Sequence, residues 1–231
     1  QEAAFYQAMW ASLKAKGRWQ GEIKNRRKNG EYYVQWVNID AISGEQGEDL
    51  FVGIASDISE LVDSREQLSN LAYFDTLTGL PNRALFQDRL RQAMIQTRRE
   101  HVVMALVFVD LDNFKAVNDT LGHAIGDELL VEVARRLHER VRESDTVARL
   151  GGDEFAIILM DAKGAEEMVR IATHLVESLS VPYKLSGYDV AGGASLGITF
   201  YPIDAMTPEE LLKNADVAMY RAKERGRNNF Q

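Results

Sequence analysis

The chain has 231 residues, of which 45% are hydrophobic, and it contains no cysteine, so it can bury a sizeable core but cannot form disulfides or thiolate metal sites. The formal net charge of −8 argues against a nucleic-acid surface, which needs a basic stripe. No apolar run approaches the roughly 20 residues that span a bilayer, so we expect a soluble domain located in the cytoplasm.

The first 57 residues predict a helix followed by an antiparallel meander. A helical amphipathic pattern begins at Phe5, and strand-like runs rich in Trp, Tyr and Val follow at 19–26, 31–42 and 50–58. Asn29-Gly30 marks a tight hairpin turn between the first two runs. Because the sequence begins at Gln1 rather than Met, we interpret it as a fragment, for which membrane segments in the parent protein are one option.

A connecting helix is expected next. Asp57 is placed as an N-cap with Glu60 three residues later, and the helix should run to about Phe74. Apolar residues recur near the a and d positions of a heptad, at Leu61, Leu68 and Leu71. Two heptads are too few to distinguish a coiled coil from a helix packed on its own domain.

From residue 75 onward, helices and strands alternate. The unbroken apolar run at 102–109 is typical of a central strand buried on both faces. Further strands are expected at 146–150, 155–160 and 194–201, and helices around 85–94, at 127–142, at 165–179 and after Thr207-Pro208. Asp127 and Glu128 are expected in the first turn of the second helix, where they would complement its dipole. The order β-α-β-β-α-β predicts an α/β (α+β) fold, namely a ferredoxin-like or palm antiparallel sheet with surrounding helices.

Carboxylates gather at one end of this predicted sheet. Asp110 ends the central strand, and the Gly151-Gly152 turn presents Asp153 and Glu154. By pattern alone, the turn is an acidic hairpin tip left in water. In a βαββαβ layer, however, the first strand commonly lies beside this hairpin, so we expect Asp110 to face Asp153. Two converging carboxylates would suit Mg²⁺, which prefers oxygen ligands and substrate phosphates.

Residues 151–155 read Gly-Gly-Asp-Glu-Phe, the naming motif of the GGDEF family of diguanylate cyclases, which the chain resembles from residue 75 to its end. Four further motif blocks match in order and spacing: 75–83, 110–127, 194–197 and 216–228. The first stretch resembles the C-terminal half of a PAS domain through residues 17–22, 28–31 and 53–59. The resemblances imply three parts: a partial PAS domain at 1–57, a signalling linker helix at 58–74 and a GGDEF domain at 75–231.

The family resemblance implies an enzyme that condenses two GTP molecules into cyclic di-GMP with release of two pyrophosphates. Its two active sites must face one another, so catalysis requires a homodimer. By the same resemblance, Asp110, the Leu111 carbonyl and Asp153 would hold Mg²⁺ or Mn²⁺, two ions per half-site. Glu154 is the neighbouring family acid, with a supporting metal or proton-transfer role.

Substrate contacts are also implied by the resemblance. Asn118 and Asp127 match guanine-reading positions, and a matching motif block contains Phe114 and His123, although for His123 we favour loop packing over a catalytic role. Three cations match the phosphate-contacting positions of the family: Lys115, Lys223 and Arg227. The alternative explanation for cations at the end of a helix is that they complement the helix dipole. For Asp127 the alternative is that a carboxylate in the first turn of a helix complements the dipole at that end.

The last feature is Arg142-Glu143-Ser144-Asp145. A charged helix end followed by an N-cap-like Asp is ordinary, but in this family the spacing implies an allosteric site at which Arg142 and Asp145 bind cyclic di-GMP for product inhibition. Two other functions stay open. The domain could instead bind GTP or cyclic di-GMP and regulate an adjoining phosphodiesterase domain, or it could cyclise another base, which Asn118 and Asp127 argue against.

Overall fold

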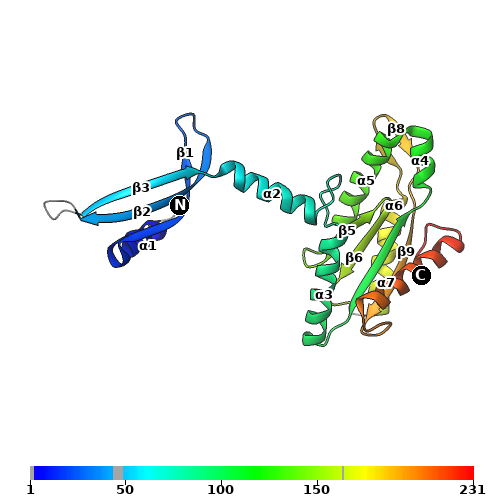
Figure 1. The fold of residues 1–231 in the computed structure, drawn as a ribbon. Helices are drawn as coiled ribbons and strands as arrows, with labels where there is room; N and C mark the ends of the chain where they lie inside the picture. Colours follow the sequence, from blue (N-terminus) through cyan, green and yellow to red (C-terminus); the bar gives the residue numbers. More distant parts are fainter. Residues whose placement is uncertain (1–2, 44–48, 163) are drawn as a thin grey trace. The chain divides into compact units, whose positions relative to one another are not determined.

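The computed structural model describes residues 3–43, 49–162 and 164–231, and it divides the chain into two compact units, Gln1–Ser69 and Asn70–Gln231 (Figure 1). Each unit is described by itself. Among the described residues, no helix combines the length and the apolar character needed to cross a membrane.

The first unit contains the predicted meander. Helix α1 (Ala3–Lys16) precedes three strands that pair in the order β1-β2-β3, all antiparallel: β1 (Arg18–Arg26), β2 (Tyr32–Ser43) and β3 (Asp49–Asp57). The predicted turn is confirmed, because Gly30 adopts a φ of 91° and the Glu31 amide donates to Asn29 Oδ1 at 3.0 Å. Helix α1 buries Met9 and Leu13. The assignment of this unit to a PAS domain stays a prediction.

Helix α2 (Ser59–Tyr73) begins as expected after Asp57. One oxygen of the Asp57 carboxylate accepts the Ser59 amide at 3.0 Å, and the other pairs with Arg27. These bonds, with Ser59 first and Arg27 after it, lower the pKa of Asp57 to about 2. The predicted heptad leucines Leu61, Leu68 and Leu71 are all more than 60% exposed, which favours the coiled-coil interpretation over packing on their own domain.

The second unit has the predicted β-α-β-β-α-β order. Its sheet runs β5-β6-β4-β9 with antiparallel neighbours throughout, which is the ferredoxin-like arrangement. The strands are β4 (Met104–Leu111), β5 (Thr146–Gly151), β6 (Glu154–Leu159) and β9 (Ala194–Tyr201). The helices around it are α3 (Arg83–Glu100), α5 (His123–His138), α6 (Ala165–Ser180) and α7 (Pro208–Glu224).

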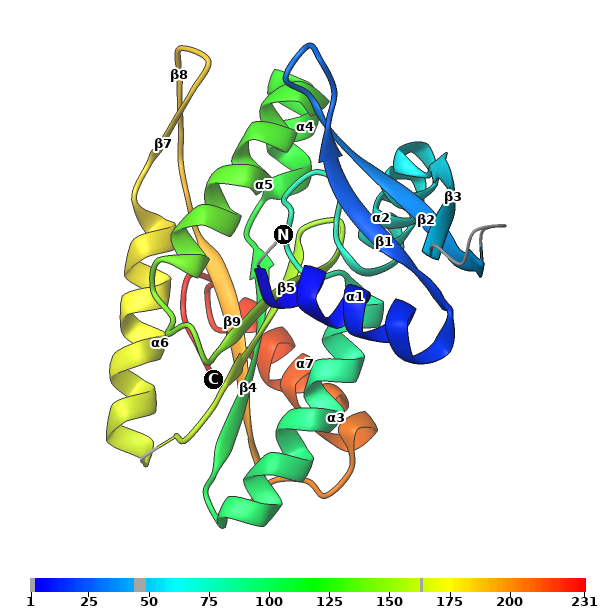
Figure 2. The same ribbon diagram turned by 90° about the vertical axis from the view of Figure 1, so that its left-hand side faces the viewer.

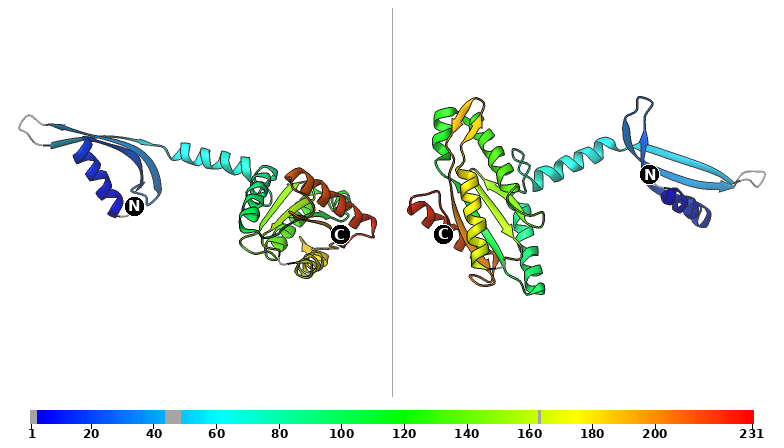
Figure 3. Two further views of the ribbon diagram at one scale, coloured as in Figure 1. Left: turned by 90° about the horizontal axis from the view of Figure 1, so that it is seen from below. Right: turned by 180° about the vertical axis from the view of Figure 1, so that it is seen from behind.

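Alternate residues of β4 serve two separate cores, which explains its unbroken apolar run. Val107 and Val109 pack with α5 and α6 on one face, whereas Leu106 packs with α3 and α7 on the other. Figure 3 shows α6 and α7 on opposite sides of the sheet. Helix α7 lies very close to β9, since a Cβ on Gly197 would come within 2.0 Å of the Ala215 carbonyl oxygen. The sheet therefore sets the position of α7 directly.

Four elements differ from the sequence prediction. Helix α4 (Phe114–Leu121) and the hairpin β7 (Tyr183–Leu185) and β8 (Tyr188–Val190) were not anticipated, and Figure 2 shows this hairpin extending beyond the four-stranded sheet. Helix α5 begins at His123 instead of 127 because Gly122, with a φ of 87°, separates it from α4. Asp127 is therefore beyond the first turn, and the dipole explanation for it was wrong.

The predicted start of α7 is confirmed, and α3 also begins at a side-chain cap, which was not predicted. Thr207 accepts the Glu210 amide at 3.2 Å with Pro208 as the first helical residue of α7. Asn82 caps α3 by accepting from Ala84 and Leu85, and its own amide donates to the Ala72 carbonyl at 2.9 Å. Asn82 thus also ties the start of α3 to the end of α2.

Candidate active site

Asp110 lies at the end of β4, as predicted, and it is buried there. The prediction that β4 lies beside the hairpin is confirmed. In the strand register, however, Asp110 is opposite Glu154 on β6, and a register shift between Arg149 and Gly151 accompanies this pairing. Asp153 lies one residue earlier, and its carbonyl accepts the Leu111 amide at 3.3 Å. Both acidic residues of the turn, Asp153 and Glu154, therefore lie next to the end of β4.

The charge of Asp110 is balanced by a cation from a distant part of the chain. Lys223, in the last turn of α7, places Nζ 2.7 Å from Asp110 Oδ2. Burial raises the pKa of Asp110, Lys223 opposes this, and the nearby charges of Asp153 and Asp112 raise it further, so the net shift is upward. Several carboxylates are thus held together at some electrostatic cost, which a bound cation would relieve.

The Gly151-Gly152 turn is held by Arg149 of β5, which is itself held by Asp75 from outside the hairpin. Its glycines adopt φ values of 139° and 54°, which other residues rarely adopt. Arg149 donates to the Gly152 carbonyl at 3.1 and 2.8 Å and to both oxygens of Asp75 at 3.0 and 3.1 Å. Burial opposes ionisation of Asp75, but hydrogen bonds from Thr78 and Arg149 outweigh it and lower its pKa. The sequence alone indicated no role for Asp75 or Arg149, although Asp75 lies in a matching motif block and Arg149 lies two residues before the 151–155 motif.

Glu154 is partly exposed beside the turn. Its carboxylate lies 3.5 Å from Arg83 Nη2, and Arg83 Nε donates to the Leu150 carbonyl at 3.2 Å. A cavity of about 470 Å³ brings Glu154 together with Asp110 and Lys223, and Asp216 and Tyr220 of α7 also line it. Three of the predicted site residues therefore share one open space between the sheet end and α7.

The predicted guanine-reading residues lie on the neighbouring pair α4 and α5. Asn118 Oδ1 is buried and has no hydrogen-bond partner among the described residues. It packs against Gly126, where an added Cβ would lie only 1.9 Å from that oxygen. Asp127, the next residue of α5, is exposed. A buried acceptor without a partner beside an exposed carboxylate is an arrangement that can receive N–H donors from a planar base.

The remaining predicted substrate residues do not line the cavity beside Asp110. Phe114 is half-buried with its ring 3.4 Å from the added Cβ position of Gly126, and Lys115 is exposed on the same helix. His123 is exposed and is the first residue of α5. Arg227 is exposed in the turn that follows α7, with a φ of 62°.

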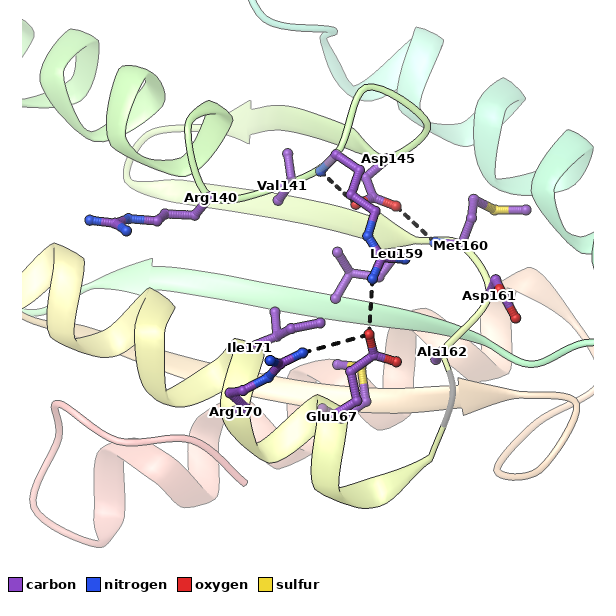
Figure 4. A pocket seen from close by; sticks show the side chains of 12 residues that line it. Arg140, Val141, Asp145, Leu159, Met160, Asp161, Ala162, Glu167, Arg170 and Ile171 are labelled. Carbon is purple, nitrogen blue, oxygen red and sulfur yellow. Dashed lines mark hydrogen bonds and ion pairs between the residues drawn. The ribbon is translucent and has the colours of Figure 1, made fainter.

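Arg142 and Asp145 line a separate cavity, in which Figure 4 labels Asp145. Both oxygens of Asp145 accept backbone amides, from Arg142 at 2.9 Å and from Met160 at 3.0 Å. The Arg142 guanidinium pairs with Glu167 of α6 at 2.9 Å. A cavity of about 100 Å³ beside this pair is also lined by Arg140 and Arg170. Asp145 therefore bonds to the backbone on both sides of the β5-β6 hairpin and caps none of the described helices, and Arg142 and two further arginines line a small opening.

Known proteins resemble this chain most clearly in the second unit. Residues 72–229 match the family described as the diguanylate cyclase GGDEF domain. The bifunctional diguanylate cyclase and cyclic di-GMP phosphodiesterase MucR of Pseudomonas aeruginosa is 48% identical over 172 residues, which are 74% of this chain and 25% of MucR. The diguanylate cyclase TpbB of the same species is 42% identical over 205 residues, which are 87% of this chain and 47% of TpbB.

Solved structures agree with the fold of this unit. A truncated TpbB that comprises only its GGDEF domain matches with a TM-score of 0.66 and 45% identity, over 68% of this chain and 92% of that one. The coiled coil and GGDEF domain of DgcB from Caulobacter crescentus, in complex with c-di-GMP, match with a TM-score of 0.66 and 29% identity, over 74% and 91% of the two chains. The chain spans less than half the length of the two curated relatives described.

Proposed function

We propose, because this chain belongs to the GGDEF family of diguanylate cyclases, that it condenses two GTP molecules into cyclic di-GMP. In each half-reaction the 3′-oxygen of one GTP would bond to the α-phosphorus of the other. The bond from that phosphorus to the bridging oxygen breaks, and pyrophosphate leaves with the electron pair. The observation that carries this proposal is the meeting of Asp110, Glu154 and Lys223 in one cavity beside the Gly151-Gly152 turn.

The residues at the strand end fit a divalent cation by their chemistry. Asp110, Asp153 and the Leu111 carbonyl would hold two Mg²⁺ or Mn²⁺ ions, since hard cations prefer oxygen ligands. When bound, the ions would neutralise the triphosphate and polarise the α-phosphoryl group. The fit rests on the chemistry of this donor set, because the Asp153 carbonyl accepts the Leu111 amide and so brings both carboxylates and the Leu111 carbonyl to the same end of β4. Among the described residues no group of three metal-binding side chains converges, so the main-chain carbonyl and the substrate phosphates would have to complete the ligand set.

The polar side chains around this centre would bind and orient the two nucleotide parts. Asn118 and Asp127 would accept N–H donors of guanine, which adenine does not present in the same pattern. Phosphates would be held by Lys115, Lys223 and Arg227, with Phe114 and His123 nearby on α4 and α5. Glu154 would accept the proton of the attacking hydroxyl or support a metal, and Arg83 keeps its carboxylate beside the turn.

Reaction requires two facing half-sites, and we infer a homodimer. The exposed Leu61, Leu68 and Leu71 of α2 support this, because a helix with an uncovered apolar stripe is stabilised when it pairs with a second copy. We further propose that cyclic di-GMP binds at Arg142 and Asp145 and inhibits the enzyme. The arginines that line this opening support recognition of phosphate or guanine.

A second function is supported by the bifunctional nature of MucR. If the parent protein also carries a phosphodiesterase domain, this unit would bind GTP or cyclic di-GMP and regulate that domain. One experiment separates the two functions. The chain is incubated with GTP and Mg²⁺ at increasing protein concentration, and nucleotides are resolved by chromatography. Synthesis that rises more steeply than protein concentration and disappears in Asp153→Ala supports the cyclase. Binding of GTP without product at every concentration would refute it.

A further inference from the structure

Asp112 lies just beyond β4, two residues after Asp110, and no role has yet been described for it. Its amide donates to the Gly193 carbonyl at 3.0 Å, so the strand pairing with the region of β9 continues through it. One carboxylate oxygen accepts the buried Ser195 hydroxyl at 2.8 Å, and the other accepts the Asn228 amide at 2.8 Å. The Asp112 side chain therefore joins the sheet to the turn that follows α7.

The turn joined in this way has an unusual backbone. Gly226, Arg227 and Asn228 adopt φ values of 105°, 62° and 49° in succession. Residues other than glycine stay in this left-handed region only when their surroundings hold them there. Asn228 is held on both sides, since its amide bonds to Asp112 and its side chain accepts the Ser180 hydroxyl at 2.6 Å. The conformation of Arg227 thus depends on its neighbour's bonds.

The approach of these groups is close. A Cβ on Gly193 would lie 3.3 Å from Asp112 Oδ2 and 3.7 Å from Asn228 Oδ1, so glycine leaves room for the junction. Beyond it, the Asn229 carbonyl accepts the Leu196 amide at 2.9 Å, which attaches the following residues to β9. Two acids at or just beyond the end of β4 therefore bond to the C-terminal part of the chain. Asp110 pairs with the cation of Lys223, and Asp112 accepts the backbone amide of Asn228.

We propose that Asp112 is a positioning residue, which holds the left-handed turn in the conformation that presents Arg227, and that it does not bind metal. This rests on the proposed function, in which Arg227 contacts a phosphate of GTP. Both oxygens of Asp112 already accept donors from the sheet and the turn, which distinguishes it from Asp110, whose partner is the side chain of Lys223.

Asparagine offers a discriminating substitution. In Asp112→Asn the side-chain oxygen can still accept the Asn228 amide, and the side-chain NH₂ can donate to Ser195, whose hydroxyl is also an acceptor. The negative charge is lost, so a metal-binding role would not survive. In Asp112→Ala both bonds are lost. The positioning role therefore predicts that Asn rescues what Ala removes.

The experiment compares Asp112→Asn, Asp112→Ala, Arg227→Ala and the double variant Asp112→Ala/Arg227→Ala. Steady-state kinetics give kcat, KM for GTP and the Mg²⁺ dependence, and calorimetry gives the affinities for GTP and guanosine. Asp112→Ala should raise KM by about tenfold, the effect of roughly one lost hydrogen bond, and weaken GTP but not guanosine. Asp112→Asn should stay within about threefold of wild type with the same Mg²⁺ dependence. The double variant should be no worse than Arg227→Ala.

Each outcome decides between roles. If Asp112→Asn is as impaired as Asp112→Ala and needs more Mg²⁺, Asp112 binds metal and the positioning role is wrong. Additive losses in the double variant would also overturn it. If Arg227→Ala alone leaves KM unchanged, the phosphate contact in the proposed function fails instead. Should Asp112→Ala not fold in a thermal unfolding test, the Mg²⁺ dependence of Asp112→Asn still gives the answer.

Discussion

Gly126→Ala tests whether the glycine at this position of α5 leaves the room that the Asn118 side-chain amide needs to bind guanine. An alanine Cβ would lie 1.9 Å from Asn118 Oδ1 and 2.9 Å from its Cγ, whereas ordinary contact begins at 3.4 Å. The amide would have to move by about 1.5 Å, and a hydrogen bond lengthened by that amount is lost. Losing one such bond to guanine costs about 0.5–1.5 kcal/mol, so KM for GTP should rise by about two- to tenfold.

The substitution also separates binding from folding. Alanine is favoured over glycine inside a helix by about 1 kcal/mol, which works against any loss of stability from the displaced amide. The assay is KM for GTP in cyclic di-GMP synthesis, together with thermal unfolding. Asn118→Ala and Asn118→Ala/Gly126→Ala serve as controls and should resemble one another, because the first already removes the displaced group. An unchanged KM in Gly126→Ala, or a further loss in the double variant, would refute the reasoning.

Three further perturbations follow from contacts in the structure. Asp75→Asn should destabilise the protein at pH 7 by about 1–3 kcal/mol through loss of its charged bonds with Arg149. The folded pKa of Asp75 lies below its ordinary 3.8. The stability that its ionised carboxylate contributes is therefore present above pH 3.8 and is lost as pH falls below that value. Urea unfolding at pH 7 and pH 3 measures this, and a difference that grows on acidification would contradict it. Glu167→Gln should tighten cyclic di-GMP binding by about two- to fivefold in calorimetry, because it removes the carboxylate that pairs with Arg142 on a partly exposed surface, and weaker binding would exclude competition. Gly197→Ala should lower stability by at least about 1–3 kcal/mol, since the new Cβ meets backbone atoms of α7 at 2.0 and 2.3 Å, while Gly53→Ala, with contacts no closer than 3.8 Å, is the control that should unfold like wild type.

Features of the fold that local chemistry determines were predictable from the sequence. The run at 102–109 indicated a strand buried twice, and β4 indeed serves two cores with alternate residues. Thr207-Pro208 indicated the start of α7, and Asn29-Gly30 indicated the hairpin turn. In each case the residue types themselves satisfy the backbone or exclude the alternatives.

Other features depend on contacts that no local pattern contains. The start of α5 was misplaced because Gly122 separates it from α4 without any side-chain cap to mark the boundary. Asp110 was expected to face Asp153, whose charge does act on it, but the pairing of Asp110 with Glu154 in the strand register was not anticipated. The Lys223 partner of Asp110 comes from the far end of the chain, where a cation near a helix terminus would be unremarkable by itself.

The end of α2 and the Gly151-Gly152 turn are connected by a short series of bonds. Asn82 bonds to Ala72 at the end of α2, Pro81 accepts the Arg149 amide, and Arg149 holds Gly152. Each step of this path is a bond between described residues, so we expect the turn to follow a rotation of the end of α2. If the proposed synthesis of cyclic di-GMP is regulated through this helix, such a rotation would leave the chemistry of each half-site unaltered and change how often two half-sites meet, in effect their local concentration. Control would then act through the alignment of two half-sites.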